Sequence, residues 1–241
     1  MDPASVRISV DVRDDAPRAA RRAAALLATA CRDSVRARGS CEIAVSGGTT
    51  PWAMFAALAD EDVPWSALGI WQVDERIAPR GHEDRGLTHL LGSLPEEGRP
   101  HVRPMPVDEV DPGDDAALEA AARTYAATLP ERFDVVHLGL GADGHTASLV
   151  PGDPVLDVAD RDVASTDPYQ GRRRMTLTFP ALDRARQILW VATGASKARP
   201  VRMLVQRDQS IPASRVAAGV QDAVVDRAAA GPSDIPRPGR R

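Results

Sequence analysis

The 241-residue sequence contains no apolar run that approaches the ~18–20 residues of a membrane-spanning helix. Its start, MDPASVRISVDVRDDAP, has no basic segment followed by an apolar core, so we expect no signal peptide. The chain has 30 Lys and Arg against 34 Asp and Glu, a formal net charge of −4. A mildly acidic chain has no overall field that attracts nucleic acid or an anionic membrane surface. We therefore expect a soluble protein with neither partner, whose anionic ligands are bound by individually placed donors.

Cysteine is scarce. Cys31 and Cys41 lie in separate segments, and the chain has no C-x-x-C or H-x-x-x-H spacing that would indicate a metal site. Two unclustered thiols in an acidic chain without a signal sequence are typical of a reducing compartment and not of a disulfide-bonded protein. We therefore expect a cytoplasmic location, no disulfide and no metal ion.

Lysine is scarcer still. The 30 basic residues include a single lysine, Lys197, and therefore 29 arginines. Lys197 stands near an expected helix start, where the helix dipole disfavours a cation. It could be an ordinary solvated residue. In a chain that otherwise uses arginine, a compact point charge favours a functional role for Lys197.

Short apolar segments alternate along the chain with segments of helical periodicity. The expected strands are 6–10, 41–45, 69–73, 101–105, 133–138, 174–179, 187–193 and 223–226. The expected helices are 16–38, 52–58, 86–94, 114–129, 180–185 and a helix that follows Lys197 and ends at 205, whereas 152–171 is expected to be an acidic loop. This alternation predicts an α/β fold, with a mostly parallel sheet covered by helices on both faces.

The chain shows no internal repeat and no linker, so we expect one domain over 1–227 and a disordered tail over 228–241. Ligands of parallel sheets bind beyond the carboxyl ends of the strands. The polar motifs of this chain follow four of the expected strands, which end near 45, 73, 138 and 193.

The first motif is SGGTTP, residues 46–51. Its two glycines allow successive N–H groups to point at one spot, and the following helix start favours an anion. We expect Thr50 to cap that helix and Pro51 to take its first position. A tight turn with an ordinary cap is the alternative. The additional hydroxyls of Ser46, Thr49 and Thr50 favour anion binding.

The second motif is Asp74-Glu75-Arg76, which ends an expected buried strand. Three charges at a strand end can mark where the chain meets solvent. Alternatively, Arg76 grips a phosphate or carboxylate while Asp74 orients a partner. The spacing alone leaves both interpretations open.

The third motif is the turn GLGADGHTASLVPG, residues 139–152, in which Asp143 and His145 flank a glycine. A histidine can take a proton from water and return it, and a nearby carboxylate can fix its tautomer. The alternatives are a turn with local hydrogen bonds, or a dinucleotide-binding turn in which these side chains would obstruct the pyrophosphate. His137, inside the preceding strand, is expected to be a hydrogen-bonded core residue.

Five segments together resemble the 6-phosphogluconolactonase family: SGGTTP, VDER, FDVVHLGLGADGHTASLVPG, RRMTLTFPALDRARQILWVATGASK and IPASRV. The resemblance implies a Rossmann-like fold and hydrolysis of 6-phospho-D-glucono-1,5-lactone to 6-phosphogluconate, the second step of the oxidative pentose phosphate pathway. It also implies that no metal or organic cofactor is used.

The resemblance implies that His145 is the general base that acts on water. It also implies a set of residues around the phosphorylated sugar, namely Gly47, Gly48, Thr49, Arg76, Arg174 and Lys197. The chain departs from the family at Arg85-Gly86, where Ser-Asn is frequent, and at Val150, where Phe is frequent.

Two other functions remain open at this point. In the related amino-sugar phosphate deaminases the DGH turn continues towards Phe-Asn-Glu-Pro, whereas here it continues through 146–151 as TASLVP, and Arg76 replaces a tyrosine. A non-catalytic sugar-phosphate sensor could use the same pocket. The phosphorylated lactone is the expected partner, and the chain is expected to be a monomer or a weak homodimer.

Overall fold

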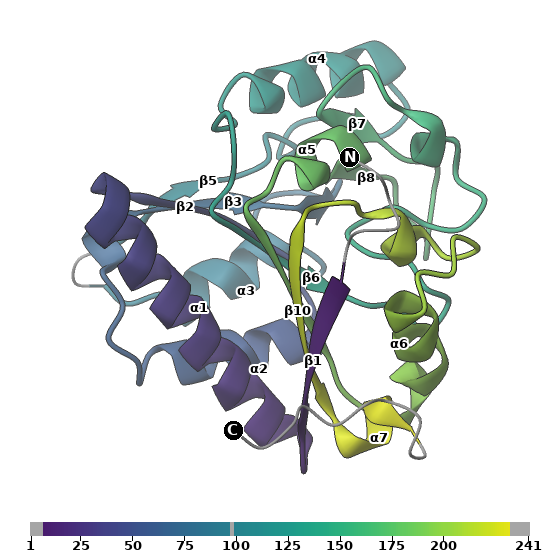
Figure 1. Cartoon of the computed structure of the whole chain (residues 1–241). Helices are drawn as coiled ribbons and strands as arrows, with labels where there is room; N and C mark the ends of the chain where they lie inside the picture. Colours follow the sequence, from purple (N-terminus) through teal and green to yellow (C-terminus); the bar gives the residue numbers. More distant parts are fainter. Residues whose placement is uncertain (1–6, 97–98, 232–241) are drawn as a thin grey trace.

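The computed structural model describes residues 7–96 and 99–231. Within these residues, a seven-stranded sheet has the spatial order β1-β10-β9-β6-β2-β3-β5, and every neighbouring pair of strands runs parallel. The strands are β1 Arg7–Arg13, β2 Cys41–Val45, β3 Leu68–Gln72, β5 His101–Arg103, β6 Val135–Gly139, β9 Gln187–Ala192 and β10 Val220–Asp226. The predicted α/β class and parallel sheet are therefore confirmed (Figure 1).

Helices cover both faces of this sheet (Figure 1). Residues of α1 to α3 pack in one buried cluster, and residues of α4 to α7 belong to the other. The helices are α1 Ala16–Arg38, α2 Thr49–Leu58, α3 Gly86–Ser93, α4 Asp115–Ala126, α5 Phe179–Asp183, α6 Ala198–Val205 and α7 Arg227–Ala230. The layered arrangement leaves the strand ends as the places where loops can gather side chains.

Helix α1 has the predicted boundaries because its end signals are local. The Asp15 side chain accepts a hydrogen bond from the Arg18 N–H at the start, and Gly39 ends the helix with its N–H on the Val35 carbonyl. Its buried stripe is mostly alanine, which lets the helix approach the sheet closely.

The central strands are apolar on both faces. In β2, Ile43 and Val45 pack on the side of α1 and α2, while Ala44 packs on the opposite side. In β9, Leu189 and Trp190 alternate in the same way. Burial on two faces explains why these strands appear in the sequence as continuous apolar runs and not as alternating ones.

A second, smaller sheet was not expected. Its strands are β4 Asp74–Arg76, β7 Val163–Ser165 and β8 Arg174–Leu177, in the antiparallel order β4-β8-β7. The predicted loop over 152–171 is wrong at β7, and the charged strand end at 74–76 is itself a strand. These elements are stabilised by pairing with segments far away in the chain, which local sequence patterns do not reveal.

The predicted disordered tail is wrong at its beginning. Residues 227–230 form α7, which buries Ala229. Asp226 is its N-cap, and the Asp226 side chain accepts a hydrogen bond from the Ala229 N–H. Residues 232–241 of the predicted tail lie outside the described residues.

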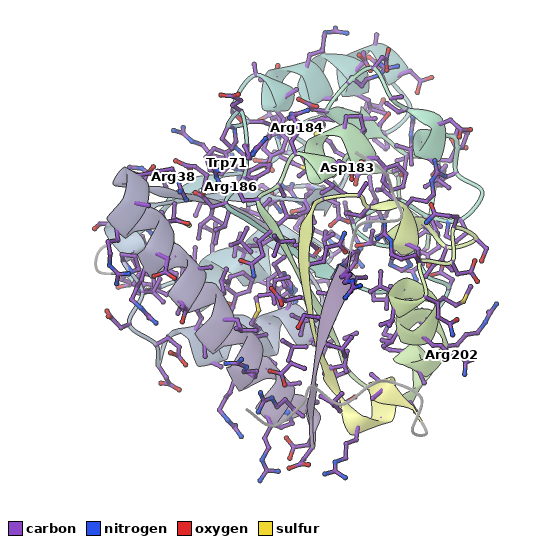
Figure 2. The ribbon with its side chains drawn as sticks, in the orientation of Figure 1. Arg38, Trp71, Asp183, Arg184, Arg186 and Arg202 are labelled. Carbon is purple, nitrogen blue, oxygen red and sulfur yellow. The ribbon has the colours of Figure 1, made fainter. Side chains whose placement is uncertain are left out.

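The amino ends of the strands are held together by a buried carboxylate. Asp134, immediately before β6, forms ion pairs with Arg38 at 2.6 Å and Arg186 at 3.2 Å. Its other oxygen accepts the Glu42 N–H at 2.9 Å. Figure 2 labels the two arginines, which come from the end of α1 and the start of β9.

The chain reverses its direction across the sheet between β2 and β6. From β2 it moves outward through β3 to β5, returns as β6 on the other side of β2, and continues to β9. The connections that follow β2 and β6 therefore lead away from each other and leave a crevice at the carboxyl ends of these strands.

Candidate active site

A cavity of about 1000 Å³ lies at this crevice. Its lining includes all ten residues that the sequence nominated: Ser46, Gly47, Gly48, Thr49, Asp74, Arg76, Asp143, His145, Arg174 and Lys197. They come from the loops after β2, β6 and β9 and from two strands of the small sheet. A single cavity thus brings together motifs that are about 150 residues apart in the chain.

The loop after β2 is tied to the loop after β6. The buried Ser46 donates its N–H to the His137 carbonyl at 3.2 Å, and its hydroxyl accepts the Gly139 N–H at 3.4 Å. Ser46 therefore fixes the spacing between the two loops, in addition to lining the cavity.

Helix α2 begins earlier than predicted. It starts at Thr49 with Gly48 as its N-cap, and no side chain caps its first turn. The Thr50 hydroxyl, expected to be that cap, instead shares a hydrogen bond of 2.9 Å with the Thr193 hydroxyl. The uncapped N–H groups of this ten-residue helix lie at the cavity wall, which is a favourable position for an anion.

Asp143 and His145 contact each other directly. The Asp143 Oδ1 atom lies 2.6 Å from His145 Nδ1 and also accepts the His145 N–H at 3.1 Å. Burial opposes ionisation of Asp143, but the hydrogen bonds and charge of His145 outweigh it and lower the pKa of the carboxyl. An ionised carboxylate only accepts hydrogen bonds, so Nδ1 carries the hydrogen and Nε2 is left to accept a proton.

Two glycines of the turn are required by its geometry. A Cβ atom on Gly141 would lie 2.1 Å from His145 Nδ1 and 2.6 Å from Asp143 Oδ1. Gly144 has a φ of 88°, in the left-handed region, and a Cβ there would lie 2.5 Å from Ile211. The glycine pattern of this turn therefore makes room for the Asp–His pair.

The small sheet places Arg76 and Arg174 side by side, as cross-strand partners in β4 and β8. The third nominated cation, Lys197, follows β9. Burial lowers the pKa of Arg174 and also that of Lys197, whose charge the neighbouring Asp143 favours. Among the described residues, no carboxylate oxygen lies within 4.0 Å of the charged nitrogens of these three side chains.

Asp74 connects the small sheet to the glycine turn. It accepts a hydrogen bond from the hydroxyl of the buried Ser148. Burial raises the pKa of Asp74, and the Ser148 hydrogen bond and the Arg174 charge oppose that effect. The partner that Asp74 orients is thus Ser148, a residue of the glycine turn 139–152.

The departure at Arg85-Gly86 has a clear structural role. Arg85 is 1% exposed, and its guanidinium lies 3.2 Å from Glu75 and 2.6 Å from Asp108. The Glu75 oxygens also accept the N–H groups of Gly86 and Leu87 at the start of α3. The buried Arg85 therefore stabilises the loop, and of these two residues only the small Gly86 lines the cavity.

Sequence reasoning missed Tyr169 and Gln170, which also line the cavity. The Tyr169 hydroxyl donates to Asp143 Oδ2 at 3.2 Å. Both residues lie in the segment expected to be a loop. The available signal was compositional, since Tyr169 is one of two tyrosines in the chain.

His137 is a core residue, as expected, but it is not hydrogen bonded. Both ring nitrogens are buried and without a partner among the described residues. Burial lowers the pKa of His137 to about 3, so the ring is neutral and packs edge-on against Phe55 at 6.3 Å.

The residues that the structure describes contain no group of three or more His, Cys, Asp or Glu side chains placed to hold a metal ion. Both cysteines are free and buried. Among the same residues, none of the helices has the length and apolar character that crossing a membrane requires.

Fold and cavity together define an α/β protein in which an Asp–His pair and cations without carboxylate partners in the described ranges lie at the switch point of a parallel sheet. A family model described as "Glucosamine-6-phosphate isomerases/6-phosphogluconolactonase" matches residues 14–225. The chain belongs to this family.

Individual relatives agree with this assignment. A 6-phosphogluconolactonase of Synechocystis is 36% identical over 184 residues, which cover 73% of this chain and 76% of the relative. A 6-phosphogluconolactonase of Streptomyces coelicolor is 36% identical over 202 residues, which cover 75% and 76%. The solved structure of 6-phosphogluconolactonase from Trypanosoma brucei superposes with a TM-score of 0.81 at 25% identity, over 94% of this chain and 98% of that one.

Proposed function

We propose that the chain hydrolyses 6-phospho-D-glucono-1,5-lactone to 6-phospho-D-gluconate, the second step of the oxidative pentose phosphate pathway, with His145 as general base. The activity is that of the relatives matched over three quarters of the chain. The observation that carries the mechanism is the Asp143–His145 pair, which faces a cavity that is also lined by three cationic side chains with no carboxylate partner within the described part of the chain.

The phosphate occupies the cationic part of the cavity. The segment Ser46–Thr49 and the uncapped start of α2 supply N–H and hydroxyl donors, and Arg76, Arg174 or Lys197 neutralises the charge. Binding there fixes the lactone so that its carbonyl lies near His145.

His145 then transfers one proton in two steps. Nε2 takes a proton from water as the water oxygen bonds to C1, and the carbonyl oxygen becomes an oxyanion. As the bond between C1 and the ring oxygen breaks, the imidazolium returns that proton to the ring oxygen. The product carries a free hydroxyl and a carboxylic acid, so atoms and charges balance.

Backbone N–H groups of the glycine turn stabilise the oxyanion in this mechanism. Those of Gly141, Gly144 and His145 already donate within the turn. The N–H groups of Ala142 and Asp143 are therefore the candidate donors, and a contact of this kind is often worth ~3 kcal/mol.

The deciding assay follows acid release from freshly prepared 6-phosphogluconolactone, above the spontaneous rate without protein. A parallel assay measures ammonia release from glucosamine 6-phosphate. We expect the first activity and not the second. Ammonia release without lactone hydrolysis would establish the deaminase alternative, and saturable binding without either reaction would establish a sensor.

We also infer a cytoplasmic location and a monomer or weak homodimer. The two buried free thiols suit a reducing compartment. Among the described residues, Leu91 and Val220 are the large apolar side chains that are exposed, so no broad apolar surface is available for a permanent interface. Light scattering across a concentration series tests the oligomeric state.

A further inference from the structure

A two-residue hairpin between β7 and β8 carries Tyr169 and Gln170 to the cavity. The Tyr169 N–H donates to the Arg172 carbonyl at 2.9 Å, and the reverse bond is 3.3 Å. The two central residues, Gln170 and Gly171, have φ values of 52° and 81°. Asparagine and glycine are common at such positions, but glutamine is not. Gln170 therefore adopts a left-handed backbone conformation that is unfavourable for its residue type.

Tyr169 contacts both members of the Asp–His pair. Its hydroxyl donates to Asp143 Oδ2, while Asp143 Oδ1 is held by His145. Its ring packs edge-on against the His145 ring, with centroids 5.4 Å apart at 68°. The Asp143 side chain is 39% exposed, so little else restrains its rotation.

The hydroxyl of Tyr169 keeps its hydrogen. Burial and the neighbouring charge of Asp143 both raise the pKa of Tyr169. The contact with Asp143 is therefore a hydrogen bond from a neutral phenol to a carboxylate, which restrains the rotation of the carboxylate without removing its charge.

The hairpin also contacts a cation of the cavity. The Arg174 guanidinium lies over the Tyr169 ring, 5.1 Å from its centroid, and donates to Gln170 Oε1 at 3.2 Å. The hairpin itself is anchored by Arg172, which bonds to the Asp84 carboxylate at 2.6 Å. One turn thus contacts both the Asp143–His145 pair and the Arg174 guanidinium.

We propose that Tyr169 is a positioning residue for lactone hydrolysis: its hydroxyl holds Asp143 in the rotamer that orients His145, and its ring holds the Arg174 guanidinium in the cavity. This role rests on the proposed function of His145. The hydroxyl acts on the proton-transfer step, whereas the ring acts on binding of the phosphorylated substrate.

Two variants separate these effects. In Tyr169→Phe the ring remains, so we expect kcat to fall about 3- to 10-fold, as for loss of one hydrogen bond to a charged group, with KM within about twofold. Without the Tyr169 hydroxyl, the charge of the Asp143 carboxylate acts more fully on His145 and stabilises its imidazolium form. The acidic limb of the plot of kcat against pH therefore moves to higher pH. In Tyr169→Leu we expect the same loss of kcat and, in addition, a rise in KM of about 5-fold or more, because Arg174 loses the ring.

The control is Asp167→Asn, an exposed residue in the same loop that lies outside the cavity. Thermal melting of each variant checks that it is folded. A Tyr169→Phe protein with wild-type kcat and an unmoved pH profile overturns the proposal, as does one whose kcat falls only in parallel with its melting temperature.

His145→Ala, measured in the same series, distinguishes the two levels of inference. If it abolishes turnover while Tyr169→Phe behaves as wild type, the positioning role alone is wrong. If His145→Ala retains wild-type turnover, the proposed mechanism is wrong and the positioning role falls with it. The expected series is a large loss for His145→Ala and a smaller loss with a shifted pH profile for Tyr169→Phe.

Discussion

The two ends of the parallel sheet use charged side chains in opposite ways. At the amino ends of the strands, Asp134 is 6% exposed and holds Arg38, Arg186 and a backbone N–H. At the carboxyl ends, Arg76 and Arg174 have no carboxylate within ion-pair distance among the described residues. The charges at the first end are paired within the fold, whereas Arg76 and Arg174 have only neutral hydrogen-bond partners among the described residues and are proposed to meet an anionic ligand.

This difference separates stability from activity in a way that substitutions can test. A change at the amino end removes contacts of the folded chain and leaves the cavity intact. A change at the carboxyl end removes groups of the proposed substrate site, and it can even relieve unfavourable burial or charge. Stability and turnover should therefore respond to different residues.

The largest expected effect is on turnover, in His145→Ala. Loss of the general base should reduce kcat by about 10²- to 10⁴-fold, with little change in the free energy of unfolding. Initial rates on fresh lactone, corrected for spontaneous opening, measure it. His101→Ala, on the edge strand β5 and away from the cavity, serves as the control. Turnover close to that of the unmodified protein would remove His145 from the mechanism.

The next effect is on stability, in Asp134→Ala. Two arginines and the Glu42 N–H lose their acceptor, so the free energy of unfolding should fall by about 2 kcal/mol while kcat and KM stay unchanged. Urea denaturation measures the free energy of unfolding, and the lactone assay measures kcat and KM. Asp33→Ala breaks an exposed pair with Arg36 and should stay below about 1 kcal/mol. Equal losses in the two variants would contradict the contrast between the ends.

A more moderate effect is expected in Arg174→Gln. Removing one charged donor from the cavity should raise KM for the lactone about tenfold, about 1.4 kcal/mol, and lower kcat less. Arg202→Gln removes an exposed arginine of α6, labelled in Figure 2, and should leave both constants unchanged. An unaltered KM in Arg174→Gln would shift the phosphate-binding role to Arg76 or Lys197.

The smallest effect concerns Asp74, whose pKa is raised by burial. The pKa of this carboxyl is higher in the folded chain than in the unfolded chain, so its ionisation lowers the free energy of unfolding. This loss of stability is absent below the unfolded pKa of about 3.9 and grows as the pH rises through the folded pKa. Asp74→Asn should therefore melt a few degrees above the wild type near neutral pH, with a gap that closes in acid. A difference in melting temperature that does not change with pH would contradict the assignment of the effect to ionisation of Asp74. Asp167→Asn is the exposed control.

Much of the site could be predicted because its signals are local. Strand β2 and helix α1 begin and end at the predicted residues, since apolar runs, a capping aspartate and a terminal glycine specify them. In a parallel sheet, loops after neighbouring strands meet at one edge, so Ser46 and His145 fall in one cavity.

The remaining features depend on contacts between distant segments. The pairing of β4 with β8 joins residues about 100 positions apart, and no local pattern in 152–171 indicates that Tyr169 reaches Asp143. Arg85 appears in the sequence as an ordinary loop arginine, but it is buried between two acidic side chains. Tertiary contacts of this kind override local propensity.

The uncompensated cations also have a consequence for how the protein is handled. An anion that binds the folded chain and not the unfolded one stabilises it by mass action, by about 2.7 kcal/mol at a concentration 100 times its dissociation constant. Inorganic phosphate or sulfate in a buffer would then occupy the place of the substrate phosphate. On the proposed function, we therefore expect a melting temperature recorded in phosphate to report site occupancy as well as folding, and we expect the same buffer to inhibit the lactone reaction competitively.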